Sequence, residues 1–153
     1  MSIEEMHRLV SENEEMSDFI GEMPEEKIVE AEEMLGVVFP KSYRDFLRNY
    51  GCGGVDGEEF YGIGPGEPTA VPSVIFITKE TRKDVNLPHE LIPVWYSGGE
   101  EECMIDLSQS DGEEAPIISW IPGMDDLEQD RTPIYPSFST FFVAQVKSAL
   151  GIE

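Results

Sequence analysis

Two acidic stretches are the most concentrated candidates for chemistry in this 153-residue sequence. Their carboxylates are Glu100, Glu101 and Glu102 in the first stretch, and Asp125, Asp126, Glu128 and Asp130 in the second. Acids at every second position, as in 126–130, are typical of calcium-binding loops. Here Arg131 stands where such a loop needs glycine, and no glutamate closes a twelve-residue loop. We therefore expect no metal site, and a basic partner is the ligand that these carboxylates suit better.

Residue types that serve in catalysis are sparse. The two histidines, His7 and His89, and the two cysteines, Cys52 and Cys103, form no metal-ligand or nucleophile–base motif. The glycine-rich stretches 51–57 and 62–66 lack the lysine and the following serine or threonine of a phosphate-binding loop, so they are interpreted as turns. We expect no enzymatic activity, no catalytic residue and no cofactor.

The composition is strongly acidic, with 32 Asp and Glu against 10 Lys and Arg and a formal charge of −22. Such a charge opposes binding to nucleic acid and to anionic membranes and favours basic partners, although acidity also serves solubility alone. We expect a cytoplasmic protein with no membrane association. The cysteines are isolated, the N-terminus lacks a signal-peptide pattern, and the sequence has no long apolar run.

The pattern of apolar residues predicts one α+β domain over residues 1–153. Its parts are N-terminal helices, a mostly antiparallel sheet of about four to six strands, and a C-terminal helix packed on the sheet. The expected helices cover 3–20, 25–35, 40–50, 73–85 and 137–150, and the expected strands cover 60–63, 91–96, 103–107 and 117–121.

Two of these helices have well-defined apolar faces. In the helix 40–50, Tyr43, Phe46, Leu47 and Tyr50 recur at helical spacing, and Gly51 is a typical helix stop. In the helix 25–35 the predicted inward residues are Ile28, Ala31, Met34 and Leu35, and the predicted outward residues are Glu25, Glu26, Glu30 and Glu33. We expect both stripes to face the core.

The last three strands determine where the acidic stretches lie. If 91–96, 103–107 and 117–121 form an antiparallel meander, alternate connections lie at the same end of the sheet. The loops 97–102 and 122–132 then share one end, and the loop 108–115 lies at the other. Tyr61, Trp95 and Tyr96 are the aromatic anchors we expect near this acidic end, which is our candidate partner-binding face.

The order of the segments resembles a known family. EEKIVEAEEMLG, VVFPKSYRDFLRNYGCGGV, EFYGIGPG, PIISW and PSFSTFF together resemble the SUKH superfamily, over about residues 23–150. That superfamily groups bacterial toxin-immunity proteins with fungal regulators of cell-wall synthesis. One departure is the turn after residue 97, where Gly98-Gly99 is followed by three glutamates instead of a Gly-Asp-type turn.

The resemblance implies a binding protein without enzymatic activity. The function we expect is an immunity protein that binds and neutralises a basic, nuclease-type toxin domain through its acidic face. Two alternatives remain: a regulatory or scaffold module whose protein partner is not a toxin, and a small-molecule binder that uses the glycine-rich loop and the three aromatics.

Overall fold

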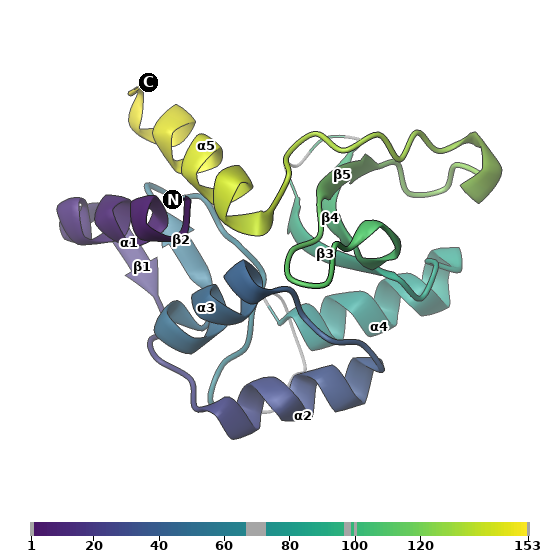
Figure 1. The fold of residues 1–153 in the computed structure, drawn as a ribbon, viewed down its shortest axis with the longest axis horizontal. Helices are drawn as coiled ribbons and strands as arrows, with labels where there is room; N and C mark the ends of the chain where they lie inside the picture. Colours follow the sequence, from purple (N-terminus) through teal and green to yellow (C-terminus); the bar gives the residue numbers. More distant parts are fainter. Residues whose placement is uncertain (1, 67–72, 97–98, 100, 153) are drawn as a thin grey trace.

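The computed structural model describes residues 2–66, 73–96, 99 and 101–152. In chain order its helices and strands are α1 (Ser2–Glu12), β1 (Ser17–Phe19), α2 (Glu25–Leu35), α3 (Lys41–Tyr50), β2 (Gly53–Val55), α4 (Val74–Val85), β3 (Leu91–Tyr96), β4 (Glu102–Asp106), β5 (Ile117–Trp120) and α5 (Phe138–Leu150) (Figure 1). Short 3-10 turns cover Glu14–Met16, Leu107–Gln109 and Asp126–Glu128. The predicted α+β class is confirmed.

The described strands form two small antiparallel sheets, β1-β2 and β3-β4-β5. Phe60 links them, because it forms single bridges to Gly53 on one side and to Trp95 on the other. The predicted strand 60–63 is therefore wrong as a strand: only this one residue takes part in pairing on both sides. The predicted meander is confirmed, with strand ends within one residue of expectation.

The N-terminal segment departs from the predicted helix 3–20. The helix ends at Glu12, and residues 17–19 pair with β2 instead. Phe19 there packs on Phe46, with ring centroids 6.2 Å apart. Gly53 permits the close pairing, since it has φ 120° and a Cβ on it would lie 2.0 Å from the Asp18 carbonyl oxygen. This long-range pairing outweighs the helical spacing of the sequence.

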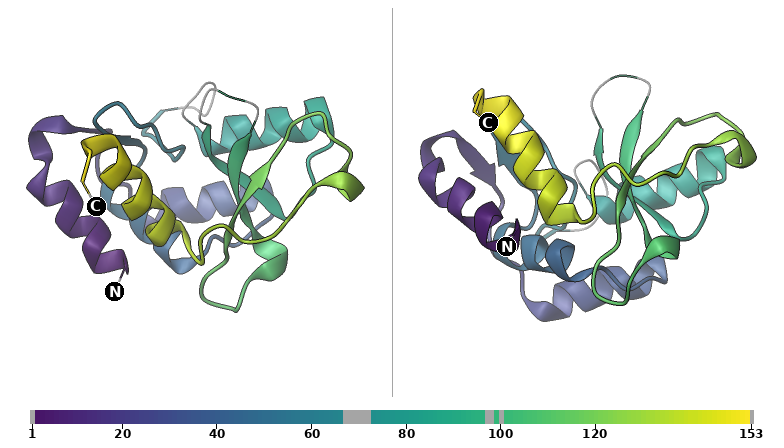
Figure 2. Two further views of the ribbon diagram at one scale, coloured as in Figure 1. Left: turned by 90° about the horizontal axis from the view of Figure 1, so that it is seen from above. Right: turned by 45° about the horizontal axis from the view of Figure 1, so that its top comes forward.

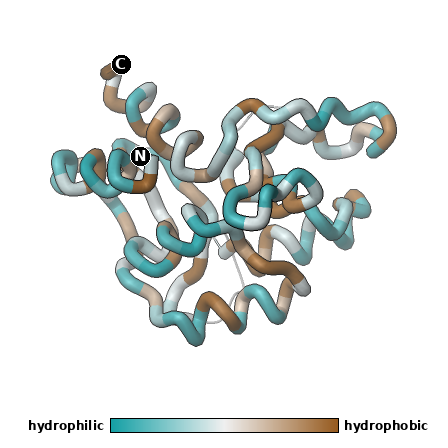
Figure 3. Tube along the Cα trace, in the orientation of Figure 1, coloured by the Kyte–Doolittle hydropathy of each residue, from teal (hydrophilic) through white to brown (hydrophobic). Residues whose placement is uncertain are grey.

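The core is built around aromatic rings from α3, α5 and the linking residue Phe60. Phe46, Phe60, Phe138 and Phe142 are fully buried, and their ring centroids lie 4.7–6.2 Å apart. Helix α5 packs against α1, α3 and β2, whereas α4 packs on β3. Figure 3 shows hydrophilic and hydrophobic positions alternating along the outer helices, as one-sided burial requires. The predicted stripe of α3 is confirmed, with only Tyr50 half-buried.

In α2 one residue predicted to face inward is exposed, and one glutamate for which no prediction was made is buried. Met34 is 39% exposed, while Glu32 is buried. The Glu32 carboxylate accepts hydrogen bonds from the Phe39 N–H at 2.7 Å and from Arg44 Nε at 3.1 Å. A buried carboxylate is tolerated because it is paired and hydrogen-bonded. Glu32 thereby holds α2 against α3.

Candidate functional site

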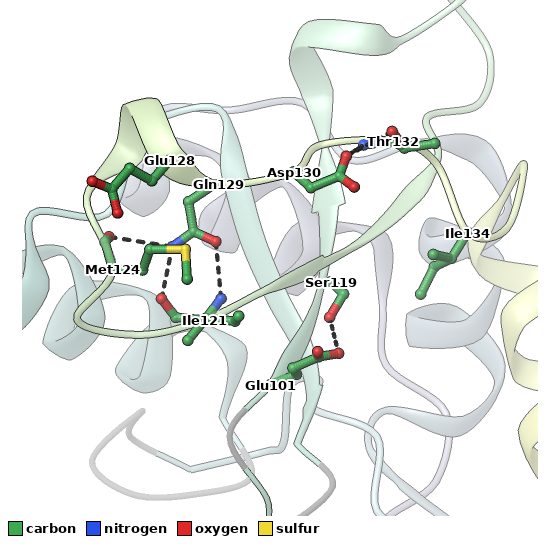
Figure 4. A pocket seen from close by; sticks show the side chains of 9 residues that line it. All are labelled: Glu101, Ser119, Ile121, Met124, Glu128, Gln129, Asp130, Thr132 and Ile134. Atoms are coloured by element: carbon green, nitrogen blue, oxygen red, sulfur yellow. Dashed lines mark hydrogen bonds between the residues drawn. The ribbon is translucent and has the colours of Figure 1, made fainter.

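The antiparallel order places Glu101 and the start of the loop that carries the second acidic stretch at the same end of the β3-β4-β5 sheet. β5 leads into an extended loop, residues 121–134, which we call the arm; the 107–115 turn lies at the opposite end of the sheet (Figure 2). Glu101, just before β4, accepts a hydrogen bond from the Ser119 hydroxyl on β5 (Figure 4). This bond places Glu101 against β5, and Glu101, Glu128 and Asp130 line a common hollow.

Gln129 fixes the shape of the arm. Its side-chain amide donates to the carbonyl oxygens of Ile121 at 2.7 Å and Met124 at 3.2 Å, and its oxygen accepts from the Ile121 N–H at 3.1 Å. At the end of β5 the Gln129 amide thus pairs with backbone groups that a neighbouring strand would otherwise bond, and it leaves fewer of them without a hydrogen-bond partner. Sequence analysis missed Gln129, since a single amide among acids carries no motif.

Arg131 fixes the returning half of the arm. Its guanidinium lies 2.8 Å from the Glu90 carboxylate and 2.9 Å from the Asp126 carboxylate, and it is stacked 5.7 Å from the Trp120 ring centroid. It also lies 3.8 Å from the buried Asp106 carboxylate. Because Glu90 precedes β3 and Asp106 ends β4, Arg131 ties the returning half of the arm toward the end of the sheet opposite to Glu101, and it offsets part of the negative charge there.

The predicted acids differ in how they are presented. Glu101, Asp125, Asp126, Glu128 and Asp130 are all exposed, and we call these five residues the acidic loop surface. Asp126 is paired as above. Asp130 accepts hydrogen bonds from the Thr132 hydroxyl at 2.6 Å and N–H at 2.9 Å, which hold its pKa below the usual range.

Two of the predicted acids lie elsewhere. Glu100 is outside the described residues. Glu102 is half-buried in β4, burial raises the pKa of its carboxyl group, and no described residue bonds to its Oε2 atom. A carboxylate held this way is less available to a partner than its exposed neighbours.

The three predicted aromatic anchors are presented unequally. Tyr61 is only 7% exposed, and burial raises the pKa of its hydroxyl to about 12. Trp95 packs edge-on against Phe141 and donates its indole N–H to Glu58 at 3.2 Å. Tyr96 is 46% exposed, and its hydroxyl donates to the Gly99 carbonyl oxygen at 2.8 Å. Of the three, Tyr96 is the one that offers a large accessible surface.

Apolar side chains accompany the acids on the arm, and sequence analysis did not single them out. Leu127 is 94% exposed, Ile134 48% and Met124 37%. Leu127 sits in the short turn Asp126–Glu128, directly between two acids. Protein interfaces have an apolar centre within a polar rim, so exposed apolar side chains surrounded by charge are candidates for contact with a partner.

Beneath the arm lies a hollow of about 400 Å³. Its lining residues are Glu101, Ser119, Ile121, Met124, Glu128, Gln129, Asp130, Thr132 and Ile134 (Figure 4). Within the described ranges, no group of three or more His, Cys, Asp or Glu is arranged to hold a metal ion. None of the helices so described is long and apolar enough to cross a bilayer.

Comparison with known proteins agrees with this fold. A solved structure titled "Crystal structure of protein from Pseudomonas syringae pv. tomato" is similar, with a TM-score of 0.55 and 18% identity, over 74% of this chain and 89% of the other. None of the curated proteins matches the chain. The family model SUKH_5, described as SMI1-KNR4 cell-wall, matches residues 1–147, which includes α1 as well as the core. The chain therefore belongs to the SUKH_5 (SMI1-KNR4 cell-wall) family.

Proposed function

We propose that this protein is a cytoplasmic immunity protein that binds a basic toxin domain through the acidic loop surface and thereby neutralises it. Members of this family are generally non-enzymatic immunity or regulatory proteins. The observation that carries the proposal is the acidic loop surface itself. It combines five exposed carboxylates and the exposed Leu127 side chain on segments that adjoin β4 and β5 of a rigid sheet.

The charge of the chain supports a basic partner. A nuclease that grips phosphates needs a positive surface, and an acidic protein that covers this surface would deny entry to the nucleic acid substrate. With a formal charge of −22, long-range attraction would also speed association, toward about 10⁸–10⁹ M⁻¹s⁻¹ at low salt. Rapid capture is useful against a toxin that acts on the cell that makes it.

The exposed apolar side chains add binding affinity that the charges alone do not provide. Exposed ion pairs contribute little to affinity, about 0–1 kcal/mol each, because water screens them. Buried apolar anchors contribute more, and Leu127 and Tyr96 have the exposed area to act as anchors. In this proposal the acids direct the approach and the apolar side chains hold the complex.

The test is a calorimetric titration against the product of the neighbouring gene, at low and at physiological salt. Tight binding that weakens with salt, and that lowers the toxicity of that product, would support the proposal. Asp125→Lys/Glu128→Lys should weaken binding, whereas Glu30→Lys/Glu33→Lys changes the net charge equally on exposed positions of α2 and should have a smaller effect. Equal effects of the two pairs would contradict a role for the acidic loop surface.

A regulatory role is the second candidate, and the cell-wall description of the matching family favours it. In that case a pull-down would capture a protein without toxic activity. Such a partner would refute the immunity function while retaining a protein-binding role.

A further inference from the structure

At the edge of β5, the hollow beneath the arm contains backbone groups of Ser119 that have no hydrogen-bond partner among the described residues. Ile117 exchanges backbone hydrogen bonds with the chain at 134–135, and Ile121 bonds on the same side to Gln129. Because backbone groups alternate along a strand, those of Ser119, halfway between, also point toward the arm. The described residues supply Ser119 with no backbone partner there, and Ser119 lines the hollow. A carbonyl oxygen is therefore open to a donor in this space.

The walls of the hollow combine apolar and acidic side chains. Ile121, Met124 and Ile134 supply apolar surface, and Ile134 and Met124 remain 48% and 37% exposed. Carboxylates surround this surface, namely Glu101 from the segment before β4 and Glu128 and Asp130 from the arm (Figure 4). All of these acids are exposed, and Lys and Arg are absent from the lining.

The hollow is held open by bonds that do not involve its occupant. Gln129 ties the outer turn of the arm to Ile121, and Arg131 ties its return to Glu90 at 2.8 Å. The Gln109 amide also donates to the Arg131 carbonyl oxygen at 2.9 Å. A site that is already shaped loses less conformational entropy when it binds.

We propose that this hollow receives an arginine side chain from an extended segment of the partner protein. The apolar stem of arginine would lie on Ile121 and Ile134 while its charged end stays among the carboxylates. Arginine is preferred over lysine because a guanidinium presents five N–H donors in a fixed geometry, which suits a lining that offers several carboxylates and the Ser119 carbonyl oxygen. This inference rests on the proposed function only in requiring a basic protein partner.

The first experiment uses short blocked peptides as probes of the hollow. Three peptides with the sequence Gly-Ser-X-Ser-Gly carry arginine, lysine or citrulline at X, and each is titrated into the ¹⁵N-labelled protein. Citrulline has the shape of arginine without its charge. The arginine peptide should shift the amide signals of Ser119, Ile121 and Ile134 most, the lysine peptide less, and the citrulline peptide hardly at all. Shifts spread evenly over α1 and α2 would overturn the proposal.

Matched variants show whether the hollow itself binds. Ile134→Ser and Glu128→Gln should each weaken binding of the arginine peptide severalfold, while Val38→Ser and Glu33→Gln make comparable changes at exposed positions elsewhere and should leave it unchanged. Circular dichroism and urea midpoints confirm that all four variants are folded. If the hollow variants bind the peptide as well as the controls do, the proposal is wrong.

The same four variants separate this inference from the proposed function. If the wild-type protein neutralises a toxin and Ile134→Ser weakens that complex about tenfold, the immunity function and the arginine site are both supported. If the toxin complex is unaffected by Ile134→Ser and Glu128→Gln, the arginine site is refuted and the immunity function stands. Peptide binding in the hollow without a toxic partner would support the site and refute the immunity function.

Discussion

Gln129→Ala removes the side chain that joins the two halves of the arm. The substitution removes three hydrogen bonds, of 2.7, 3.1 and 3.2 Å. The N–H and carbonyl groups of Ile121 then lack the Gln129 side chain as a partner. At a net value of about 0.5–1.5 kcal/mol for each bond, three bonds contribute about 1.5–4.5 kcal/mol. Because two of these bonds are only partly buried and the third is exposed, the closed arm should lose a value near the low end, about 2 kcal/mol. Since each 1.4 kcal/mol is a factor of ten, local opening should increase about 30-fold.

Amide hydrogen exchange measures this opening directly. The Ile121 N–H donates to Gln129 in the wild type, so its exchange should become about 30-fold faster in the variant. Amides in the core helix α3 should keep their protection. Gln145→Ala in α5 is the matched control, because no described residue bonds to that side chain, and it should leave Ile121 unchanged. A change in Ile121 exchange below about threefold would refute the assigned role of Gln129.

Three further predictions concern stability. Phe46→Ala should reduce the free energy of unfolding in urea by about 3–5 kcal/mol, since the ring is fully buried among other aromatics. The control Val38→Ala, at a 75% exposed position, should change it by less than about 0.5 kcal/mol. A loss below about 1 kcal/mol for Phe46→Ala would contradict the packing described. The pKa of Glu25 is lowered to about 2 by hydrogen bonds from two arginines of α3, so its stabilising effect is present above about pH 5 and is lost as the pH falls toward 2. The urea midpoints of the wild type and Glu25→Gln should therefore converge over that range, and a constant difference would refute the linkage. Burial raises the pKa of Glu102, so ionisation at pH 7 opposes folding; Glu102→Gln should raise the urea midpoint at pH 7 and lose that advantage below about pH 4, whereas a lower midpoint at pH 7 would show that the charge is compensated.

The helices were largely predictable because their signals are local. Helix α5 begins after Ser137, whose hydroxyl accepts from the Thr140 N–H at 3.2 Å, and ends at Gly151 with φ 72°. α2 has the predicted bounds and ends at Gly36, also in the left-handed region. Caps of this kind depend on residues within a few positions, so a sequence pattern can reveal them.

The two-stranded sheet was not predictable in the same way. β1 and β2 are three residues each and lie far apart in the chain, and β2 consists of two glycines and a valine. Their pairing depends on a close backbone approach that no periodicity encodes. The burial of Glu32 was not predictable for a related reason, since its partner Arg44 lies one helix further on.

The candidate site was predictable at the level of topology only. Antiparallel connectivity was enough to predict that Glu101 and the start of the arm lie at the same end of the sheet. It could not identify Gln129 or Arg131, whose roles arise from tertiary contacts, or distinguish the half-buried Glu102 from its exposed neighbours. The anchors differ likewise: Tyr61 is buried by the core, while Leu127 is exposed by a turn that only the folded arm defines.

The most direct test of the central proposal is the rate of association with the basic partner, measured by stopped-flow fluorescence over a range of ionic strengths. The proposal predicts a fast rate that falls steeply with salt, and a clearly shallower dependence for Asp125→Lys/Glu128→Lys than for the charge-matched Glu30→Lys/Glu33→Lys. Identical salt dependence for the wild type and both variants would contradict docking through the acidic loop surface.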